Sequence, residues 1–183
     1  MKNNETWNID AAHSGINFSV RHMVVSKVRG RFAQFGGNVQ LDPDDLARMT
    51  VDVEIEAASI DTGTPARDVH LRSADFLDTE NHPRLRYRSQ RVEPLAEGRY
   101  RMYGDLSIRG VTRPVELEVD YGGRAVDPWG NERAGFTART MIDRKDFGLT
   151  WNQALEAGGV LVADRVDIDI ELELVKAAAE KVA

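Results

Sequence analysis

Thirty acidic side chains oppose 24 lysines and arginines in this chain of 183 residues, which gives a net charge of −6. This balance disfavours nucleic acid or an anionic membrane as the main partner, because both attract basic proteins. The absence of cysteine excludes disulfides, thiolate nucleophiles and sulfur-bound metals. With 42% hydrophobic and 30% charged residues, the composition is typical of a soluble globular protein, and we expect one domain over residues 1–183.

The sequence carries no recognisable targeting or membrane-spanning segment. Residues 1–10 lack the apolar run of a secretory signal, and no apolar stretch is long enough to cross a bilayer as a helix. We therefore expect a cytoplasmic protein with no stable membrane insertion. A mature chain whose signal had been removed would look much the same.

Alternation of apolar and polar residues predicts the strands. In residues 50–60, Val51, Val53 and Ile55 alternate with acidic residues, so one face is apolar and the other charged. The same period of two recurs at 16–22, 85–89, 100–108, 115–121, 134–142 and 166–174. With the segments around 27–42, these make about eight antiparallel strands separated by glycine and proline turns. We favour a closed barrel over a sandwich, because closure leaves no exposed strand edge.

The segments between the strands are expected to be short helical turns and loops. We predict one turn at 43–48, one or two turns within 61–83 ending at Pro83, and a long loop before the last strand. Residues 145–148 are interpreted as a strand that ends at Phe147 and Gly148. The terminal segment 176–183 is predicted to be a frayed helical tail.

Strands of this length could also form an outer-membrane barrel with its apolar face towards lipid. Aromatic residues make up only 7%, and the other face of the last strand would place several acids inside a narrow lumen. Those acids are Asp167, Asp169, Glu171 and Glu173. We therefore expect the apolar face to lie inside and the charged face outside.

No motif predicts catalysis or metal binding. The four histidines have no spacing that places two nitrogens on one metal, so we expect no metal site. His13 and Ser14 would point to opposite faces of an extended strand, which argues against a hydrolase triad. Alternate arginines at 84, 86 and 88 could bind nucleic acid, but acids on neighbouring strands explain them as cross-strand pairs.

Polar residues are concentrated in the crossing segment around residues 67–72. Arg67, Asp68 and His70 lie close together there. One interpretation is a buried Arg67–Asp68 hydrogen-bond network that ties the crossing to the barrel, and the other is a site for a ligand head group. Both interpretations place the segment at the barrel rim.

Five separated blocks resemble the YceI-like family of polyisoprenoid-binding proteins over roughly residues 6–176. The blocks are WNIDAAHSGINFSVRHM, VRGRFAQFGGNV, ASIDTGTPARDVHLRSADFLDTENHPRLRYRS, GDLSIRGVTRPVEL and GFTARTMIDRKDFGLTW. The resemblance implies a lipocalin-like, extended eight-stranded antiparallel barrel that holds a long isoprenoid chain, often as a homodimer and without enzymatic activity. It also implies a polar network at the barrel end. Its members are expected to be Asp10, His13, Arg67, Asp68, His70 and Arg144.

We therefore expect part of the inner face to be filled core and part to line a tunnel for an isoprenoid or quinone-like amphiphile. Small inward residues such as Gly104, Ala134 and Ala138 favour a tunnel over a filled core. The expected ligand contacts are Phe18, Val20, His22, Phe32, Ile55, Leu71, Phe76, Tyr87, Met102, Gly104, Leu106, Ile108, Phe136 and Ala138. No cofactor is expected apart from the bound lipid. The expected function is non-enzymatic binding, sequestration or transport of this ligand. Two alternatives stay open: a barrel enzyme that acts on a lipid or small acid with His22 or His70 as base, and a filled barrel that acts as an interaction module.

Overall fold

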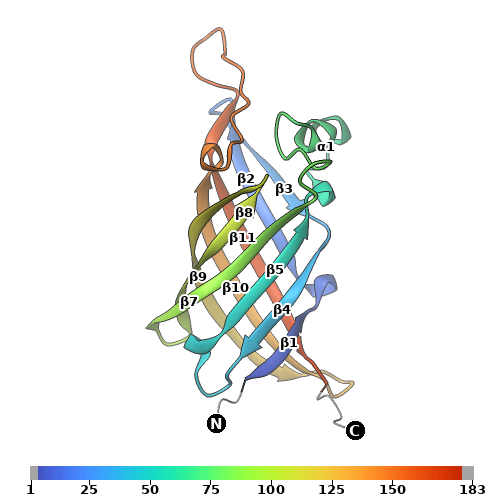
Figure 1. Cartoon of the computed structure of the whole chain (residues 1–183), viewed down its shortest axis with the longest axis vertical. Coiled ribbons are helices and arrows are strands. Elements are labelled where there is room, and N and C mark those ends of the chain that lie inside the picture. The colour runs from blue at the N-terminus through green and yellow to red at the C-terminus, as the bar shows by residue number, and fades with distance from the viewer. Residues whose placement is uncertain (1–3, 179–183) are drawn as a thin grey trace.

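The computed structural model describes residues 4–178, which form a tall antiparallel β-barrel (Figure 1). Its strands are β1 (Glu5–Ile9), β2 (Gly15–His22), β3 (Ser26–Phe32), β4 (Phe35–Leu41), β5 (Thr50–Glu56), β6 (Ile60–Asp61), β7 (Arg84–Ala96), β8 (Arg99–Ile108), β9 (Val111–Val126), β10 (Glu132–Asp143) and β11 (Val162–Lys176). Its helical elements are α1 (Pro65–Arg72) and the 3₁₀ turns η1 (Ala11–His13), η2 (Leu46–Arg48), η3 (Ala57–Ser59) and η4 (Arg144–Phe147).

The strands occupy eight positions around a closed ring, as the alternation predicts. The ring closes because β1 and β2 pair with successive parts of β11. β1 pairs with β4, which pairs with β5. In the same way, β2 pairs with β3, which pairs with β6. Three of the eight positions are therefore long strands that are each broken once, formed by β1 with β2, β4 with β3, and β5 with β6. The prediction of an eight-stranded antiparallel barrel is confirmed.

Local hydrogen bonds explain where the first long strand breaks. The side chain of Asp10 accepts a hydrogen bond from the backbone N–H of Ala12 and thereby starts the turn η1. Asp10 and His13, two members of the expected polar network, lie in this turn between β1 and β2. The break leaves the His13 side chain outside the barrel, with 61% of its surface exposed.

The outer face of the barrel carries the predicted charge ladder between β5 and β7. Arg86 pairs with Asp52 at 2.6 Å, and Arg84 pairs with Glu54 at 3.0 Å. Hydrogen bonds from Arg86 and then Arg88 lower the pKa of Asp52 against the opposing effect of burial. Cross-strand pairs of opposite charge favour one register over its neighbours, so these arginines have a structural role.

The sequence predicts some of the connections between strands correctly and others wrongly. The helical turns expected within 61–83 are present as α1, and η2 lies within the expected turn at 43–48. The strand expected at 145–148 is wrong: residues 144–147 form η4, which Gly148 ends in the left-handed conformation at φ 75°. Lys176 belongs to β11, and residues 179–183 of the expected helical tail lie outside the described residues.

Candidate functional site

A cavity of about 580 Å³ lies inside the barrel. Its wall is built from inward positions of most of the strands, and aliphatic and aromatic side chains dominate it. This follows from the period of two, because every second residue of each strand faces the interior. The volume is within the range of sites that hold small organic ligands.

All the residues expected to contact a ligand lie on the cavity wall except Gly104. They are Phe18, Val20, His22, Phe32, Ile55, Leu71, Phe76, Tyr87, Met102, Leu106, Ile108, Phe136 and Ala138. The wall also includes residues that the sequence analysis did not single out, among them Met49, Thr140, Trp151 and Leu161. Trp151 and Leu161 belong to the long loop before β11, where no periodicity indicates which side chains turn inward.

Gly104 lies behind the ring of Tyr87 and not on the wall. A Cβ atom at this position would come within 2.5 Å of the carbonyl oxygen of Arg88 and within 2.6 Å of the ring and hydroxyl of Tyr87, so only glycine fits here. Burial raises the pKa of the Tyr87 phenol, and the charge of Asp105 adds to this effect. Gly104 is therefore absent from the cavity wall, where Tyr87 takes its place, and its contact with a ligand stays a prediction.

The end of the barrel nearest the termini is sealed. Trp7 of β1 is fully buried there, and the Arg124 guanidinium lies 5.1 Å from the centroid of its ring. Arg124 forms an ion pair with Glu132 at 2.6 Å, and Lys176 forms ion pairs with Glu132 and Glu5. A packed tryptophan under a layer of ion pairs prevents a long ligand from passing through this end.

The opposite end carries α1, η4 and the loop before β11 (Figure 1). An aromatic cluster joins these segments: the ring of His70 lies 5.1 Å from Phe76 and 4.7 Å from Trp151, measured between centroids. His70 also shares a hydrogen bond of 2.8 Å with Asp75. His70, Phe76 and Trp151 all line the cavity, so this cluster forms one side of its mouth.

Arg67 and Asp68 form no direct ion pair, and the hydrogen-bond network between them runs through Thr62. Neighbouring residues on a helix point about 100° apart, and each of these side chains instead binds Thr62. Oδ1 of Asp68 accepts hydrogen bonds from the backbone N–H and the hydroxyl of Thr62, at 2.9 and 2.6 Å. Arg67 donates to the hydroxyl and carbonyl oxygens of Thr62, at 2.7 and 2.9 Å. The two residues therefore fasten α1 to the segment that follows β6, while Arg67 also lines the cavity.

Removal of the Asp68 carboxylate should destabilise the protein. The side chain is buried, and Asp68→Ala leaves the N–H and hydroxyl of Thr62 without their acceptor. We expect a loss of about 1–3 kcal/mol in the free energy of unfolding, measured by urea denaturation. Asp44→Ala makes the same change at an exposed side chain and should have little effect. Equal stability of the two variants would contradict the role of Asp68 in fastening α1 to Thr62.

Arg144 organises the loop at the mouth. Its side chain is 3% exposed and donates hydrogen bonds to the backbone oxygens of Leu149, Trp151, Val162 and Ala163. Burial lowers the pKa of the guanidinium, and the nearby charges of Asp164 and Asp143 oppose this shift. One buried cation thus holds both ends of the loop between η4 and β11 against the barrel.

The expected single polar network is divided between the two ends. Asp10 donates its backbone N–H to Glu173, whereas Arg144 binds the backbone of Val162. Eleven residues of an extended strand separate these points of β11, a distance of about 36 Å. Arg67, Asp68, His70 and Arg144 therefore lie near the mouth, while Asp10 and His13 lie far from it.

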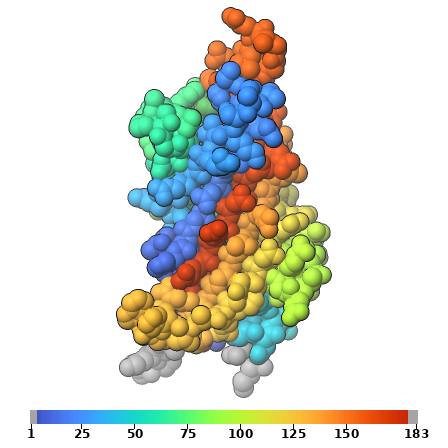
Figure 2. All heavy atoms as spheres, turned by 180° about the vertical axis from the view of Figure 1, so that it is seen from behind, coloured from blue at the N-terminus to red at the C-terminus, as the bar shows by residue number. Residues whose placement is uncertain are grey.

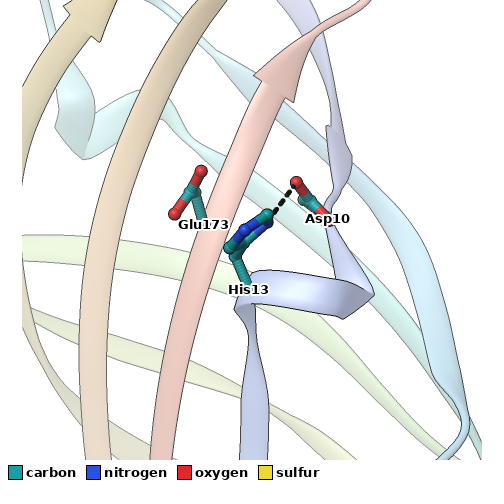
Figure 3. Close-up of side chains that lie close together, drawn as sticks. All are labelled: Asp10, His13 and Glu173. Carbon is teal, nitrogen blue, oxygen red and sulfur yellow. Dashed lines mark hydrogen bonds and ion pairs between the residues drawn. The ribbon is translucent and has the colours of Figure 1, made fainter. Parts of the chain in front are cut away.

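Asp10, His13 and Glu173 come close enough to one another to suggest a metal site (Figure 3). Arg133 already binds both carboxylates, however: its Nη1 lies 2.8 Å from Asp10 and 2.5 Å from Glu173. His13 Nδ1 shares a hydrogen bond of 2.9 Å with the same Asp10 carboxylate. A guanidinium in this position repels a cation, so the group is an ion-pair network that ties β10 and β11 to η1.

The expectation that no metal is needed stays a prediction. Dialysis against a strong chelator should change neither the melting temperature nor any lipid retained by the protein, because Arg133 occupies the carboxylates of the most compact ligand group. The two properties can be followed by thermal denaturation and by mass spectrometry of solvent extracts. If chelation lowers the melting temperature or the lipid content, and added zinc restores it, the expectation that no metal is needed is refuted.

The Arg133 network should stabilise the protein in a pH-dependent way. Hydrogen bonds from Arg133 and then His13 lower the pKa of Asp10 from 3.8 to about 2. This contribution is complete above the unfolded pKa and is lost as the pH falls through the folded value. We expect Arg133→Met to lower the urea midpoint at pH 7, and the difference from the parent protein to shrink between about pH 4 and 2. A difference that does not change over this range would contradict the pairing.

Comparison with known proteins places this architecture in a family. The YceI-like domain matches residues 7–174. The chain belongs to the YceI-like family. It is 38% identical over 138 residues to a UPF0312 protein of Vibrio cholerae, covering 75% of this chain and 73% of that protein. It is 41% identical over 138 residues to a UPF0312 protein of Serratia proteamaculans, covering 75% and 71%.

Solved structures share the YceI-like fold. Burkholderia cenocepacia BcnA superposes with a TM-score of 0.79 at 23% identity, covering 90% of this chain and 98% of that one. The Campylobacter jejuni YceI protein gives a TM-score of 0.75 at 28% identity, covering 86% and 90%. A polyisoprenoid binding domain from Saccharophagus degradans gives 0.70 at 16% identity, covering 93% and 98%. Among the described residues, no helix is long and apolar enough to span a membrane.

Proposed function

We propose that this YceI-like protein binds and carries one long apolar chain, a polyisoprenoid or a similar amphiphile, inside its barrel. The observation that supports this most strongly is the cavity of about 580 Å³, with its almost wholly apolar wall. A water-filled cavity of this kind leaves the wall without apolar partners, so a ligand that displaces the water gains binding free energy. The polyisoprenoid binding domain of Saccharophagus degradans has the same fold, which supports this class of ligand.

The closed end and the polar mouth suggest how the ligand is oriented. The apolar tail extends towards Trp7, while a polar head, such as that of a quinone, stays near Arg67 and His70 at the mouth. Burial of one isoprene unit contributes about 3–4 kcal/mol before the cost of association. A few units therefore suffice for tight binding without a specific contact along the tail.

We propose carriage rather than catalysis, because neither candidate base is arranged to react. The His22 ring makes no hydrogen bond to a side chain of residues 4–178. The His70 ring is held by Asp75 between two aromatic residues. A hydrogen-bond partner that fixes the tautomer favours a histidine as general base, and the partner of His70, Asp75, holds its ring within the aromatic rim. A homodimer and a cytoplasmic location remain predictions of the sequence analysis, and sedimentation and cell fractionation test them.

Mass spectrometry of solvent extracts from the purified protein tests the proposal. We expect a polyprenyl or prenylated-quinone species at close to one molecule per barrel. Protein purified after on-column delipidation, then exposed to the same extract, should recover the same species and serves as the control for carry-over. Extracts without any long-chain lipid, together with no uptake by the delipidated protein, would refute the proposal.

A further inference from the structure

The tip of the β2–β3 hairpin exposes three apolar residues in succession. Met23, Val24 and Val25 are 44%, 73% and 86% exposed. Met23 and Val24 also have positive φ angles of 52° and 64°, a conformation that a β-branched residue such as valine rarely adopts. A surface turn of this kind is normally built from glycine or asparagine, so apolar side chains at this turn are unfavourable for folding and solubility. We call these three residues the apolar tip.

The apolar tip stands at the mouth of the cavity. The backbone N–H of Met23 donates a hydrogen bond of 2.9 Å to the carbonyl oxygen of Leu161, and His22 pairs with Val162. His22, Leu161 and Val162 all line the cavity. Figure 2 shows the hairpin in blue packed against the orange loop, which projects further at this end of the molecule. A surface that holds the apolar tip therefore also lies against the entrance of the barrel.

Three cations lie on the two strands that carry the apolar tip. Arg21, Lys27 and Arg29 are exposed, Arg21 also belongs to the cavity lining at the mouth, and none of the three forms an ion pair with an acid of residues 4–178. Two acids at the start of β11 have basic partners already: Asp164 pairs with Lys145 at 3.0 Å, and Asp167 pairs with Arg165 at 2.7 Å. The three cations are thus free to attract an anionic surface.

We propose that the apolar tip and its three flanking cations dock the protein on the surface of an anionic lipid bilayer. Apolar side chains enter the boundary between head groups and acyl chains, while Arg21 and Lys27, which face each other across the hairpin next to the tip, bind the anionic head groups. The net charge of −6 does not prevent this, because charges more than about 10 Å from the contact are screened at 0.1 M salt. The binding is peripheral and reversible, so it agrees with the absence of stable insertion. Its purpose, the passage of a chain between bilayer and cavity, rests on the proposed function.

Flotation with vesicles tests the docking. The protein should float with vesicles of phosphatidylglycerol and phosphatidylcholine, but not with phosphatidylcholine alone, and 1 M salt should release it. Val24→Asp should weaken vesicle binding at least about tenfold, because a charge replaces a buried apolar side chain. Aspartate tolerates the left-handed conformation better than valine, so this variant should fold. Arg21→Gln and Lys27→Gln should each weaken binding about fivefold.

Val126→Asp is the matched control. Val126 is 68% exposed, close to the 73% of Val24, and lies at the end of β9 on the sealed side of the barrel. This variant should bind vesicles as the parent protein does. Equal binding by the Val24→Asp and Val126→Asp variants, or equal binding of the parent protein to neutral and anionic vesicles, would overturn the proposal. So would a parent protein that ignores vesicles and forms a dimer that Val24→Asp dissociates.

The docking and the proposed function can fail separately. If extracts contain no long-chain lipid while flotation still depends on Val24, the protein docks on membranes and the carrier function is wrong. If extracts contain the lipid while flotation does not depend on Val24, the carrier function stands and the docking is wrong. Where the carrier function stands, Val24→Asp should take up lipid from a solvent-dispersed source as the parent protein does, because the cavity wall is unchanged.

Discussion

Ala138→Phe should greatly reduce the lipid bound by the protein and leave the fold almost unchanged. Ala138 lies on the cavity wall between the inward residues Phe136 and Thr140 of β10. A phenyl group there occupies space equivalent to about one isoprene unit, and the loss of that unit's burial, about 3–4 kcal/mol, weakens binding by about two to three orders of magnitude. In a filled core, the same insertion would overpack the interior and destabilise it by about 1–3 kcal/mol.

The comparison must use delipidated protein, because a ligand that binds only the folded state raises the apparent stability. Lipid content is measured by mass spectrometry, and stability by thermal denaturation. Met141→Phe is the control on the same strand, since Met141 points outward and is 59% exposed. A variant at residue 138 that unfolds would favour the filled barrel, and one that keeps its full lipid content would show that the ligand does not reach β10.

Arg144→Met should destabilise the protein by about 3 kcal/mol or more. Methionine keeps part of the packing volume but removes the donors that satisfy the carbonyl oxygens of Leu149, Trp151, Val162 and Ala163. Unsatisfied buried acceptors cost about 1–3 kcal/mol each, and part of that cost is relieved where the loop opens to water. We therefore also expect the loop before β11 to become sensitive to proteases. Urea denaturation and limited proteolysis measure the two effects.

Arg139→Met provides the matched control. Arg139 lies on β10, its side chain is 67% exposed, and its ion pair with Asp120 is long, at 3.6 Å. Such a surface pair contributes little, so the control should unfold within about 0.5 kcal/mol of the parent protein. If the Arg144 and Arg139 variants unfold at the same urea concentration and resist proteolysis equally, Arg144 does not hold the loop.

The period of two predicts the barrel because it acts in every strand. One apolar face on each of about eight strands is buried most completely by closing the sheet, so strand number, direction and inward residues follow from the pattern. The pattern does not indicate where a long strand is interrupted, because a turn such as η1 depends on one side chain, Asp10, bonding the backbone two residues later. The same limit explains η4, where Gly148 ends a turn within a segment interpreted as a strand.

The cavity wall is predictable to the extent that its residues belong to regular strands. Phe136 and Ala138 face inward by alternation alone. The mouth depends on contacts between distant segments: Trp151 reaches His70 across the barrel end, and Arg67 and Asp68 meet at Thr62 instead of at each other. Local spacing carries no information about such contacts. Adjacent residues of a helix look like a pair in the sequence even when their side chains diverge.

Equilibrium binding of linear polyprenols of increasing length tests the central claim most directly. The delipidated protein would be titrated while its tryptophan fluorescence is followed, because Trp151 lines the cavity. An apolar tunnel with one sealed end predicts that affinity rises with each added isoprene unit until the cavity is full, and that further units add nothing. Affinity that does not depend on chain length, or no binding at any length, would contradict a barrel that carries an apolar chain.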